Sequence, residues 1–579
     1  MERTRLLTHL WEFQNSAGFI SDSAILEIAQ KLKVSKIEIE GVVSFYHFFH
    51  RKSTGKFIIY LNNSITSEFK GFLEVKAAFE KETGCTFGCY DQNPLFSLFE
   101  TSCIGLNDQE PAGLINFHPF TNLTPDNVKT IIQQLKNGSC LKTISSNPLS
   151  KIQYTPPEDK TVFFRNYVIG NAIKKLKSKN ASEILDIIIE SGLNGRGGAF
   201  FSTGKKWKYC KENKNSKKFI ICNADEGEPG TFKDKSIINN LPGLIIEGMV
   251  IAAYVTGATE GIIYLRAEYN YLLPKLEKTI QEFYQKGLLG NNIYSITNFK
   301  FNLQVQLGAG AYVCGAETAL IESLEGKRGE PRIRKYFPTE LGYLESSTVV
   351  NNVETLAMAA RTIELGSSFI SKIGTKCSKG TKIVSLSGDV AKPGIYEIEW
   401  GTTIKEILDL SQATSPNYIQ ISGPSGECLN NTEFNRKICK DDLICGGSIM
   451  VFNRNRSILH ILENFMEFFK RESCGTCTPC RVGNQILYEK VKKFQKGICT
   501  KKDIEEVKKW GEIIKLTSRC GLGQFSANTF VMALDKFEDY FNMKIINSNE
   551  NQNVEFDMVN AVFDYDYLIK NTQIKEIIS

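Results

Sequence analysis

Residues 222–234 read CNADEGEPGTFKD and follow directly on the apolar run of residues 218–221, KFII. A short apolar run bounded by polar residues predicts a buried strand. Ligands of open α/β sheets bind beyond the carboxyl ends of the strands, so this loop predicts recognition of a ring or a ribose. A solvated loop is the alternative interpretation. The polar side chains that crowd the loop are Asn223, Asp225, Glu226 and Glu228.

A glycine-rich stretch precedes this loop. Residues 190–207 read ESGLNGRGGAFFSTGKKW and gather glycines around Arg196 and Lys206. Glycine lets a backbone approach a ligand closely, and bared N–H groups beside a cation suit a phosphate. A plain turn remains the alternative for a loop of this kind.

Two later stretches repeat the order of strand, polar loop and helix. Residues 306–332, beginning QLGAGAYVCG, form the first. Residues 348–357, TVVNNVETLA, place Asn351 and Asn352 at a turn before a helix. An N-cap explains one of these asparagines but hardly both.

A dense thiol site lies in residues 472–481, ESCGTCTPCR. Neighbours this close clip almost no loop, so disulfides are a poor explanation. Zinc usually takes two separated pairs of ligands. Three thiolates from one tight turn and one remote thiolate are typical of a [4Fe–4S] cluster. Zinc and unligated cysteine remain as alternatives for Cys474, Cys477 and Cys480.

The remote ligand is expected to be Cys520, in residues 517–530, TSRCGLGQFSANTF. The glycine that follows it lets the backbone approach a cluster. Cys499 is nearer in sequence but lies in a lysine-rich stretch without glycine, so it ranks second.

Length and composition bound the remaining possibilities. The chain has 579 residues, beyond the ~250–300 at which one core stops growing, so several domains are expected. A net charge of +6 over this length gives no argument for nucleic acid. The apolar stretch 241–258 carries Glu247 and is too short to span a bilayer, so it predicts a buried helix and no membrane insertion. Most of the sixteen cysteines stand singly in apolar context, which predicts a reducing, cytoplasmic location.

The pattern of elements predicts an α/β multidomain protein. Helical periodicity marks residues 456–545, where Ile458, Leu462, Phe465 and Phe469 form one apolar stripe. The predicted segments are a helical start (1–52), a small α/β domain (53–138), a polar linker (139–160), a large α/β domain (161–375), a β-rich module (380–455), the helical region (456–545) and a C-terminal extension (546–579).

Five motifs occur in a fixed order: GRGGA, NADEGEPGTFKD, GAGAYVCG, NNVET and ESCGTCTPCR. In this order they resemble the NADH-oxidising flavoprotein family. That family includes the NADH-binding subunit of respiratory complex I, the diaphorase alpha subunit of soluble NAD-reducing hydrogenases, and the flavoprotein of some formate dehydrogenases. The hydrogenase diaphorase is the most similar of these, and the likeness extends through residues 44–61, SFYHFFHRKSTGKFIIYL.

The resemblance implies a fold for each segment. Residues 53–138 would form a thioredoxin-like domain and residues 161–375 a Rossmann-like FMN/NADH domain. Residues 380–455 would form a ubiquitin-like β-grasp module of the soluble-ligand-binding type. The C-terminal helical bundle would hold the [4Fe–4S] cluster on Cys474, Cys477, Cys480 and Cys520.

The resemblance also implies the cofactor site. FMN would be held by Gly195, Arg196, Gly197, Gly198, Lys206, Asn223, Asp225, Glu226, Tyr312, Gly315, Asn351 and Asn352. NAD(H) would contact the catalytic carboxylates Glu228 and Glu317, with Phe201, Tyr209, Arg334 and Phe337 around the adenine.

The implied activity is that of an NADH dehydrogenase or diaphorase, of the hydrogen:NAD⁺ oxidoreductase type. Nicotinamide gives two electrons as hydride whereas a cluster takes one at a time, so a flavin lies between them. The implied partners are hydrogenase subunits and a ferredoxin-like iron–sulfur subunit. Two alternatives stay open: a flavoprotein of formate dehydrogenase or of a complex I-like assembly, and a degenerate docking subunit without turnover.

Several positions depart from the family pattern. In the N-terminal domain the early loop LNNSITSEF lacks cysteine, and CIGLN pairs Cys103 with Asn107. We therefore expect no [2Fe–2S] cluster there and a docking role for the domain. At the flavin site Phe200 replaces a glycine, which is tolerable only if the ring turns outward at negative φ. Ala316 removes a carboxylate, and Lys335 and Tyr336 replace a pair of prolines.

Overall fold

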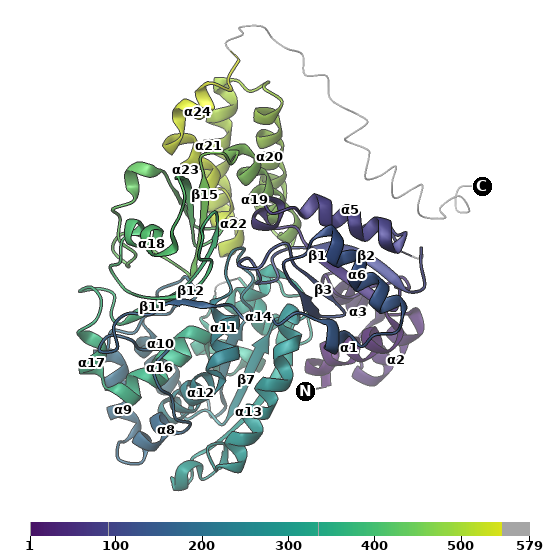
Figure 1. Cartoon of the computed structure of the whole chain (residues 1–579). Coiled ribbons are helices and arrows are strands. Elements are labelled where there is room, and N and C mark those ends of the chain that lie inside the picture. The colour runs from purple at the N-terminus through teal and green to yellow at the C-terminus, as the bar shows by residue number, and fades with distance from the viewer. Residues whose placement is uncertain (1, 91, 334, 547–579) are drawn as a thin grey trace.

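The computed structural model describes residues 2–90, 92–333 and 335–546. These residues form three sheets and a C-terminal group of helices (Figure 1). The four-stranded, thioredoxin-like sheet lies beside the N-terminal helices in Figure 1. The five-stranded sheet of residues 218–352, called the large sheet below, lies under the six-stranded mixed sheet in this view. The predicted C-terminal extension lies outside the described residues beyond Ile546, and the predicted domain boundaries stay predictions.

The N-terminal part combines three helices with a four-stranded sheet of order β2-β1-β3-β4. One face of this sheet packs on two helices through a core that includes Phe79, Leu98 and Ile132. The other face contributes Tyr60 and Phe99 to a core shared with the N-terminal helices and the large sheet. The elements are α1 (Leu6–Ala17), α2 (Asp22–Leu32), α3 (Lys36–Val43), β1 (Phe57–Asn62), α5 (Phe72–Thr83), β2 (Phe96–Thr101), β3 (Gly113–Ile115), β4 (His118–Phe120) and α6 (Pro125–Lys136).

The large sheet has the order β10-β6-β7-β9-β8, and its first four strands are parallel. Parallel strands bring their carboxyl ends to one edge, where ligands of such sheets bind. The loops after β6, β9 and β10 therefore meet there, as the three polar and glycine-rich stretches predict. The elements are β6 (Lys218–Ala224), β7 (Glu260–Leu265), β8 (Gly290–Asn291), β9 (Lys300–Leu307) and β10 (Ser347–Asn352).

Helices cover this sheet, among them α10 (Thr203–Glu212), α12 (Pro242–Thr256), α14 (Glu317–Leu324) and α16 (Val353–Leu365). Nearly every residue of α12 is buried, so the predicted buried helix is confirmed. Among the described residues no single helix has the length and apolarity to cross a membrane. One pair bent by 94°, Lys233–Asn240 with Pro242–Thr256, passes on length and composition.

The mixed sheet has the order β14-β13-β15-β11-β12-β5. Its first member in sequence, β5 (Ile152–Tyr154), lies within the stretch predicted as an aperiodic linker and pairs in parallel with β12. Three residues are too short a run for a strand pattern to be visible, which is why the sequence showed only polar chain there. The other elements are β11 (Thr381–Gly388), β12 (Gly394–Glu399), α18 (Ile404–Ser411), β13 (Pro416–Ile421), β14 (Glu427–Leu429) and β15 (Ser448–Asn453).

The C-terminal helices enclose the predicted cysteine site. The apolar stripe of α19 is buried at all four predicted positions. The helices are α19 (Ile458–Glu472), α20 (Thr478–Gln495), α21 (Lys501–Thr517), α22 (Gly521–Ser526), α23 (Asn528–Lys536) and α24 (Glu538–Asn542).

A polar edge of α19 docks on the thioredoxin-like domain. His460 Nε2 lies 2.5 Å from Glu68 Oε2, and Asn464 Nδ2 donates to Glu68 Oε1 at 2.8 Å. The hydrogen bond with Glu68 raises the pKa of His460 above its usual 6.5. The contact therefore joins two residues that are 392 positions apart in the sequence.

This contact predicts a pH-dependent stability. A raised folded-state pKa means that the contribution of His460 is fully present below pH 6.5 and is lost as pH rises through the folded value. Replacing His460 with Gln is expected to lower the midpoint of thermal unfolding at pH 6 and to have less effect at pH 9. A difference between wild type and variant that does not change with pH would contradict the ion pair.

Candidate functional site

The loop after β6 is fixed by the loop after β9. Asn223 Nδ2 donates to the carbonyl of Gly315 at 2.8 Å, and Asn223 Oδ1 accepts from the backbone N–H of Asp225 at 3.1 Å. A Cβ added at Gly315 would lie 3.2 Å from the carbonyl oxygen of Asp225, so glycine permits this approach. Asn223, Asp225 and Gly315 are thus brought together as predicted.

The Asp225 carboxylate fits a ligand position. Its Oδ2 atom is buried and has no hydrogen-bond partner among the described residues. Burial raises the pKa of Asp225 to about 8. Buried polar atoms are nearly always paired in folded proteins, so this oxygen is the kind of group that a bound flavin's polar edge would satisfy.

The glycine loop leaves backbone exposed beside the same edge. Gly197 and Gly198 are exposed, and Gly198 has φ of +111° with open space where a side chain would stand. A Cβ at Gly197 would lie 3.2 Å from Cβ of Asn352. The loop is closed by a hydrogen bond from Gly195 N to the carbonyl of Phe201 at 2.8 Å. These residues fit the close approach that a cofactor phosphate requires.

Two of the predicted FMN ligands have side chains committed elsewhere. The Arg196 guanidinium is buried and contacts Glu354 and the carbonyls of Lys379 and Thr381. The Glu226 carboxylate accepts from the backbone N–H of Asp234 at 2.8 Å and from the Tyr269 hydroxyl at 2.9 Å. Both side chains hold the loop from behind rather than facing the cradle.

Both asparagines at the end of β10 have structural partners. Asn352 caps α16 by accepting from the N–H of Glu354 at 3.0 Å, and its amide also binds Asp234. Asn351 Oδ1 accepts from the Trp207 indole at 2.9 Å. The N-cap role accounts for Asn352 only. Asn351 is explained by its hydrogen bond with the buried indole of Trp207, which is 144 positions away in the sequence.

The two predicted catalytic carboxylates are held differently. Glu228 binds the Tyr312 hydroxyl, and its Oε1 accepts from the backbone N–H of Ser425 at 3.0 Å. Burial raises the pKa of Glu228 to about 7, although these two hydrogen bonds oppose the shift. Glu317 accepts from Lys206 Nζ at 3.0 Å. Ser425 lies in the loop between β13 and β14 of the mixed sheet. No pattern in the sequence indicated that this loop contacts Glu228.

Aromatic side chains flank the cradle on the outside. Phe201, Tyr209 and Phe337 are 47%, 51% and 66% exposed, and the rings of Phe201 and Tyr209 lie 6.5 Å apart. Exposed rings of this size suit stacking on a planar ligand. Arg334, also predicted here, lies outside the described residues.

A buried charge cluster beneath the cradle was missed by sequence reasoning. Glu354 is fully buried and pairs with Arg196 at 3.3 Å, with Lys233 at 3.3 Å and with Lys382. Burial opposes ionisation of Glu354, but the three cations outweigh it and lower its pKa to about 2. Lys382 comes from β11, so the cluster joins the mixed sheet to the glycine loop.

Phe200 leaves the cradle open, but its backbone conformation differs from the one expected. Its φ is +51°, not negative, and its ring packs on Trp400 of the mixed sheet, with ring centroids 5.6 Å apart. The side chain is 7% exposed and belongs to the core of that sheet. The burial of the ring offsets the strain of a left-handed backbone, which is about 1–2 kcal/mol.

Two substitutions at Phe200 separate these effects. Phe200→Ala is expected to destabilise the protein by about 3 kcal/mol, because it removes the buried ring. Phe200→Gly should be less harmful by about 1 kcal/mol, because glycine accepts positive φ. Denaturant unfolding followed by tryptophan fluorescence measures both. A glycine variant more stable than wild type would show that the ring contributes nothing.

The four predicted cluster cysteines are brought together. Cys474 lies in the turn after α19, Cys477 and Cys520 are the N-caps of α20 and α22, and Cys480 is in the first turn of α20. A Cβ at Gly523 would lie 3.1 Å from Cβ of Cys480, so glycine lets α22 close over the triad.

The thiols share one environment. Burial, together with smaller contributions from the other three thiols, raises the pKa of Cys480 to about 12. Thiolates at this site therefore need a cation, which iron would supply. Zinc bound by the same thiolates stays the alternative interpretation of this site.

Cys103 lies in a second polar site, in the thioredoxin-like domain. Its Sγ lies 2.9 Å from Asn107 Oδ1, and Asn107 Nδ2 donates to Thr66 Oγ1 at 2.8 Å. Arg266 Nη2 donates to the carbonyl of Cys103 at 2.8 Å, and the same guanidinium also reaches the loop after β6 through the carbonyl of Glu226. The Cys103 loop is thus linked through one side chain to the candidate flavin site.

Family models match three parts of the chain. Residues 188–361 match the Nuo51 FMN-binding domain, and residues 460–544 match the iron–sulfur binding region of NADH-ubiquinone oxidoreductase-F. Residues 1–136 match the thioredoxin-like [2Fe–2S] ferredoxin. The thioredoxin-like, FMN-binding and iron–sulfur regions of the predicted multidomain fold are confirmed.

The expectation of no [2Fe–2S] cluster is wrong by the third of these matches, which assigns residues 1–136 to a [2Fe–2S] ferredoxin family. The expectation rested on the register of four cysteines in two short loops. The match instead covers the whole domain.

The chain is similar to known hydrogenase proteins over nearly its full length and to a quinone oxidoreductase subunit over about two thirds of it. The NAD-reducing hydrogenase HoxS subunit alpha of Cupriavidus necator is 42% identical over 584 residues, covering 99% of this chain and 97% of that protein. An NADH-quinone oxidoreductase subunit of Aquifex aeolicus is 40% identical over 64% of this chain and 87% of that protein. A chain from an NAD⁺-reducing [NiFe]-hydrogenase in the H₂-reduced state superposes with a TM-score of 0.89 at 31% identity, covering 99% and 97% of the two chains.

These similarities confirm the predicted electron transfer between NADH, FMN and iron–sulfur, and the predicted activity of NADH dehydrogenase type. The motifs in residues 190–357 and 472–481 carried that prediction, and the parallel sheet and the helical bundle give each a place. The chain belongs to the family of the complex I 51 kDa-like NADH-binding subunits.

Proposed function

We propose that this chain is the diaphorase subunit of a soluble, cytoplasmic NAD-reducing hydrogenase. In this role it passes electrons between NAD(H), FMN and a [4Fe–4S] cluster. Support comes from its likeness to the HoxS alpha subunit, which extends from the N-terminal helices to the iron–sulfur region. The partners are then hydrogenase subunits and a ferredoxin-like iron–sulfur subunit. The mixed sheet with α18 serves as the ubiquitin-like β-grasp module.

The residues of the cradle have distinct roles in this proposal. The exposed backbone of Gly197 and Gly198 faces the phosphate, and Asn223 and Asp225 face the polar edge of the flavin. When bound, FMN supplies the conversion between a two-electron hydride and single electrons. Arg196 and Glu226 shape the loop from behind.

The nicotinamide side is formed by two carboxylates. Glu228, with its pKa near 7, accepts from the Tyr312 hydroxyl and takes up a proton over part of the physiological range. Glu317 orients Lys206 by the contact of 3.0 Å. Phe201, Tyr209 and Phe337 give the adenine an apolar surface and exclude water from it.

One observation carries the proposal: the candidate flavin and cluster sites share a wall. Tyr312, which binds Glu228, packs its ring on Phe468 of α19 with centroids 4.9 Å apart. Phe468 lies one and a half turns before Cys474 on the same segment. In this proposal a carrier of electron pairs and an acceptor of single electrons would be held on either side of this ring contact.

An anaerobic NADH titration tests the proposal. Flavin absorbance is expected to bleach first, and a reduced [4Fe–4S] signal should follow by EPR. A matched titration of the Cys480→Ala variant should bleach flavin without the cluster signal. Purified protein that contains neither flavin nor iron after anaerobic reconstitution would contradict the proposal and would favour a degenerate subunit.

A further inference from the structure

Glu472 connects three parts of the chain through one carboxylate. It is the last residue of α19 and lies two positions before Cys474. Its Oε1 accepts from the Ser102 hydroxyl at 2.8 Å, and its Oε2 accepts from the backbone N–H of Tyr312 at 3.0 Å. Ser102 is adjacent to Cys103, so the carboxylate lies between the two cysteine loops and the flavin-side loop.

We propose that Glu472 is a positioning residue that fixes the turn of Cys474 relative to Tyr312, and hence the cluster relative to the flavin. This inference rests on the proposed function. The rate of electron transfer between two centres falls as their separation grows, so a shift of the Cys474 turn away from Tyr312 would slow it. A charged acceptor for a backbone N–H holds position better than a neutral one, because such bonds are about twice as strong.

Phe468 and Glu472 act on the same target from successive turns. Phe468 meets the Tyr312 ring edge-on at 66°, and Glu472 holds the Tyr312 backbone. The Tyr312 hydroxyl in turn binds Glu228. The ring contact holds the loop against the helix, and the backbone hydrogen bond adds a directional contact that favours one register.

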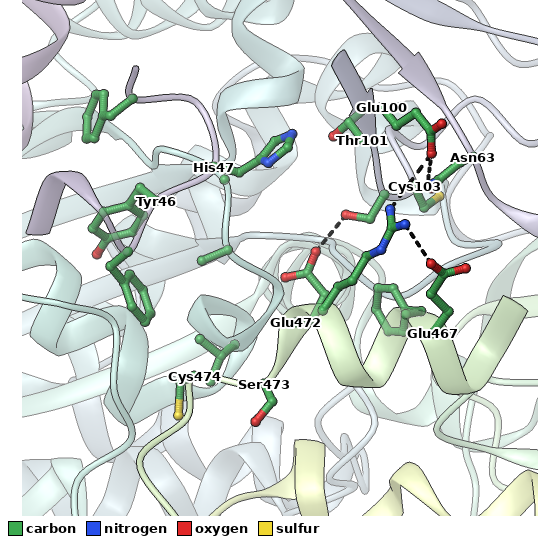
Figure 2. A pocket seen from close by; sticks show the side chains of 18 of the residues that line it. Tyr46, His47, Asn63, Glu100, Thr101, Cys103, Glu467, Glu472, Ser473 and Cys474 are labelled. Atoms are coloured by element: carbon green, nitrogen blue, oxygen red, sulfur yellow. Dashed lines mark hydrogen bonds and ion pairs between the residues drawn. The ribbon is translucent and has the colours of Figure 1, made fainter. Parts of the chain in front are cut away.

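A cavity beside this junction makes the contact hard to replace. Figure 2 shows Glu472, Ser473 and Cys474 on one side of it, with His47 and Cys103 on others. The cavity has a volume of about 540 Å³. Packing does not fill this side of the junction, so a shortened side chain at position 472 opens onto this cavity. The neighbouring Arg471 instead pairs with Glu467 at 2.6 Å.

The chemistry of Glu472 provides matched variants. In Glu472→Gln the amide oxygen still accepts from Tyr312 N–H, and the amide nitrogen donates to Ser102, whose hydroxyl can turn to accept. Glu472→Ala removes both contacts. Ser102→Ala removes only the contact to the Cys103 loop. Glu467→Ala removes a carboxylate from the same helix without touching Tyr312 and serves as the control.

Hydrogen exchange tests the contact itself. The amide of Tyr312 should exchange about tenfold faster in Glu472→Ala, because a hydrogen bond to a charged group is worth about 1.5–3 kcal/mol. Ser102→Ala and Glu467→Ala should stay within about twofold of wild type, and Glu472→Gln, which keeps a weaker neutral acceptor, should fall between wild type and Glu472→Ala. Unchanged exchange in Glu472→Ala would overturn the proposal, whether or not flavin or cluster is present.

Anaerobic stopped-flow then tests the role. In Glu472→Ala, NADH should bleach the flavin at nearly the wild-type rate, and the reduced cluster should form more slowly than in wild type. Glu472→Gln should recover the second rate. Equal slowing of both steps would overturn the positioning role. Absence of flavin and cluster signals in wild type would refute the proposed function, and the exchange result would still decide the contact.

Discussion

Glu354→Ala is expected to destabilise the protein by about 3–5 kcal/mol, because it leaves the buried cations Arg196 and Lys382 without their acidic partner, whereas Lys233 keeps Asp234. Arg196, Lys233 and Lys382 all contact this carboxylate, which is fully buried. Glu282→Ala is the control, since Glu282 forms an exposed pair with Lys286 at 2.8 Å and such pairs contribute about 0–1 kcal/mol. Denaturant unfolding of both variants measures the difference.

The acid limb of stability should report the same group. The pKa of Glu354 falls from 4.5 to about 2 on folding. A lowered folded-state pKa gives stability that is present above pH 4.5 and is lost as pH falls toward 2, amounting to about 3 kcal/mol. Glu354→Gln should flatten this limb, and adding Lys382→Met should restore part of the lost stability by removing one unpaired cation. A double variant less stable than Glu354→Gln would show that Lys382 does not depend on Glu354.

Cys520→Ala is expected to abolish the [4Fe–4S] cluster, lowering iron by about four atoms per chain. The N–H groups of Leu522 and Gly523 face the Cys520 sulfur and lower its pKa against the effect of burial. Alanine removes one of the four thiol ligands, and three thiolates do not complete the coordination of a four-iron cluster. Iron and sulfide analysis of anaerobically reconstituted protein, with EPR of the reduced form, measures the loss.

Cys499→Ala is the matched control for this prediction. Cys499 is also buried in the helical bundle, but its backbone carbonyl pairs with Ile546 and its thiol is not among the groups that shift the pKa of Cys480. This variant should keep its iron. Equal loss of the cluster in both variants would mean that burial of a thiol in the bundle, rather than ligation by Cys520, determines the iron content.

The contrast between Asp225 and Arg196 shows how far sequence reasoning reached at the candidate site. Asp225 was predicted from a loop that follows a buried strand, and such loops meet at one edge of a parallel sheet. Arg196 was predicted to face the cofactor because it stands among glycines. Its direction depends on Glu354, 158 positions away, and on the start of β11. Pairing between buried charges leaves no periodic pattern in either segment.

Local spacing determined a great deal by itself. The triad of Cys474, Cys477 and Cys480, the glycine loop and the buried helix α12 could all be predicted, because the residues that matter lie within one or two turns of each other. The order of the motifs along the chain is also visible without the structure, and this order indicated the family.

Only the tertiary structure decided how these local pieces face one another. The Phe200 ring packs in the mixed sheet at a positive φ, and β5, within the predicted linker, pairs with β12. Glu472 accepts hydrogen bonds from both Ser102 and Tyr312. Each of these outcomes is a contact between segments more than 150 residues apart. The physical reason is that burial and hydrogen bonding select partners by distance in space, which a one-dimensional pattern does not encode.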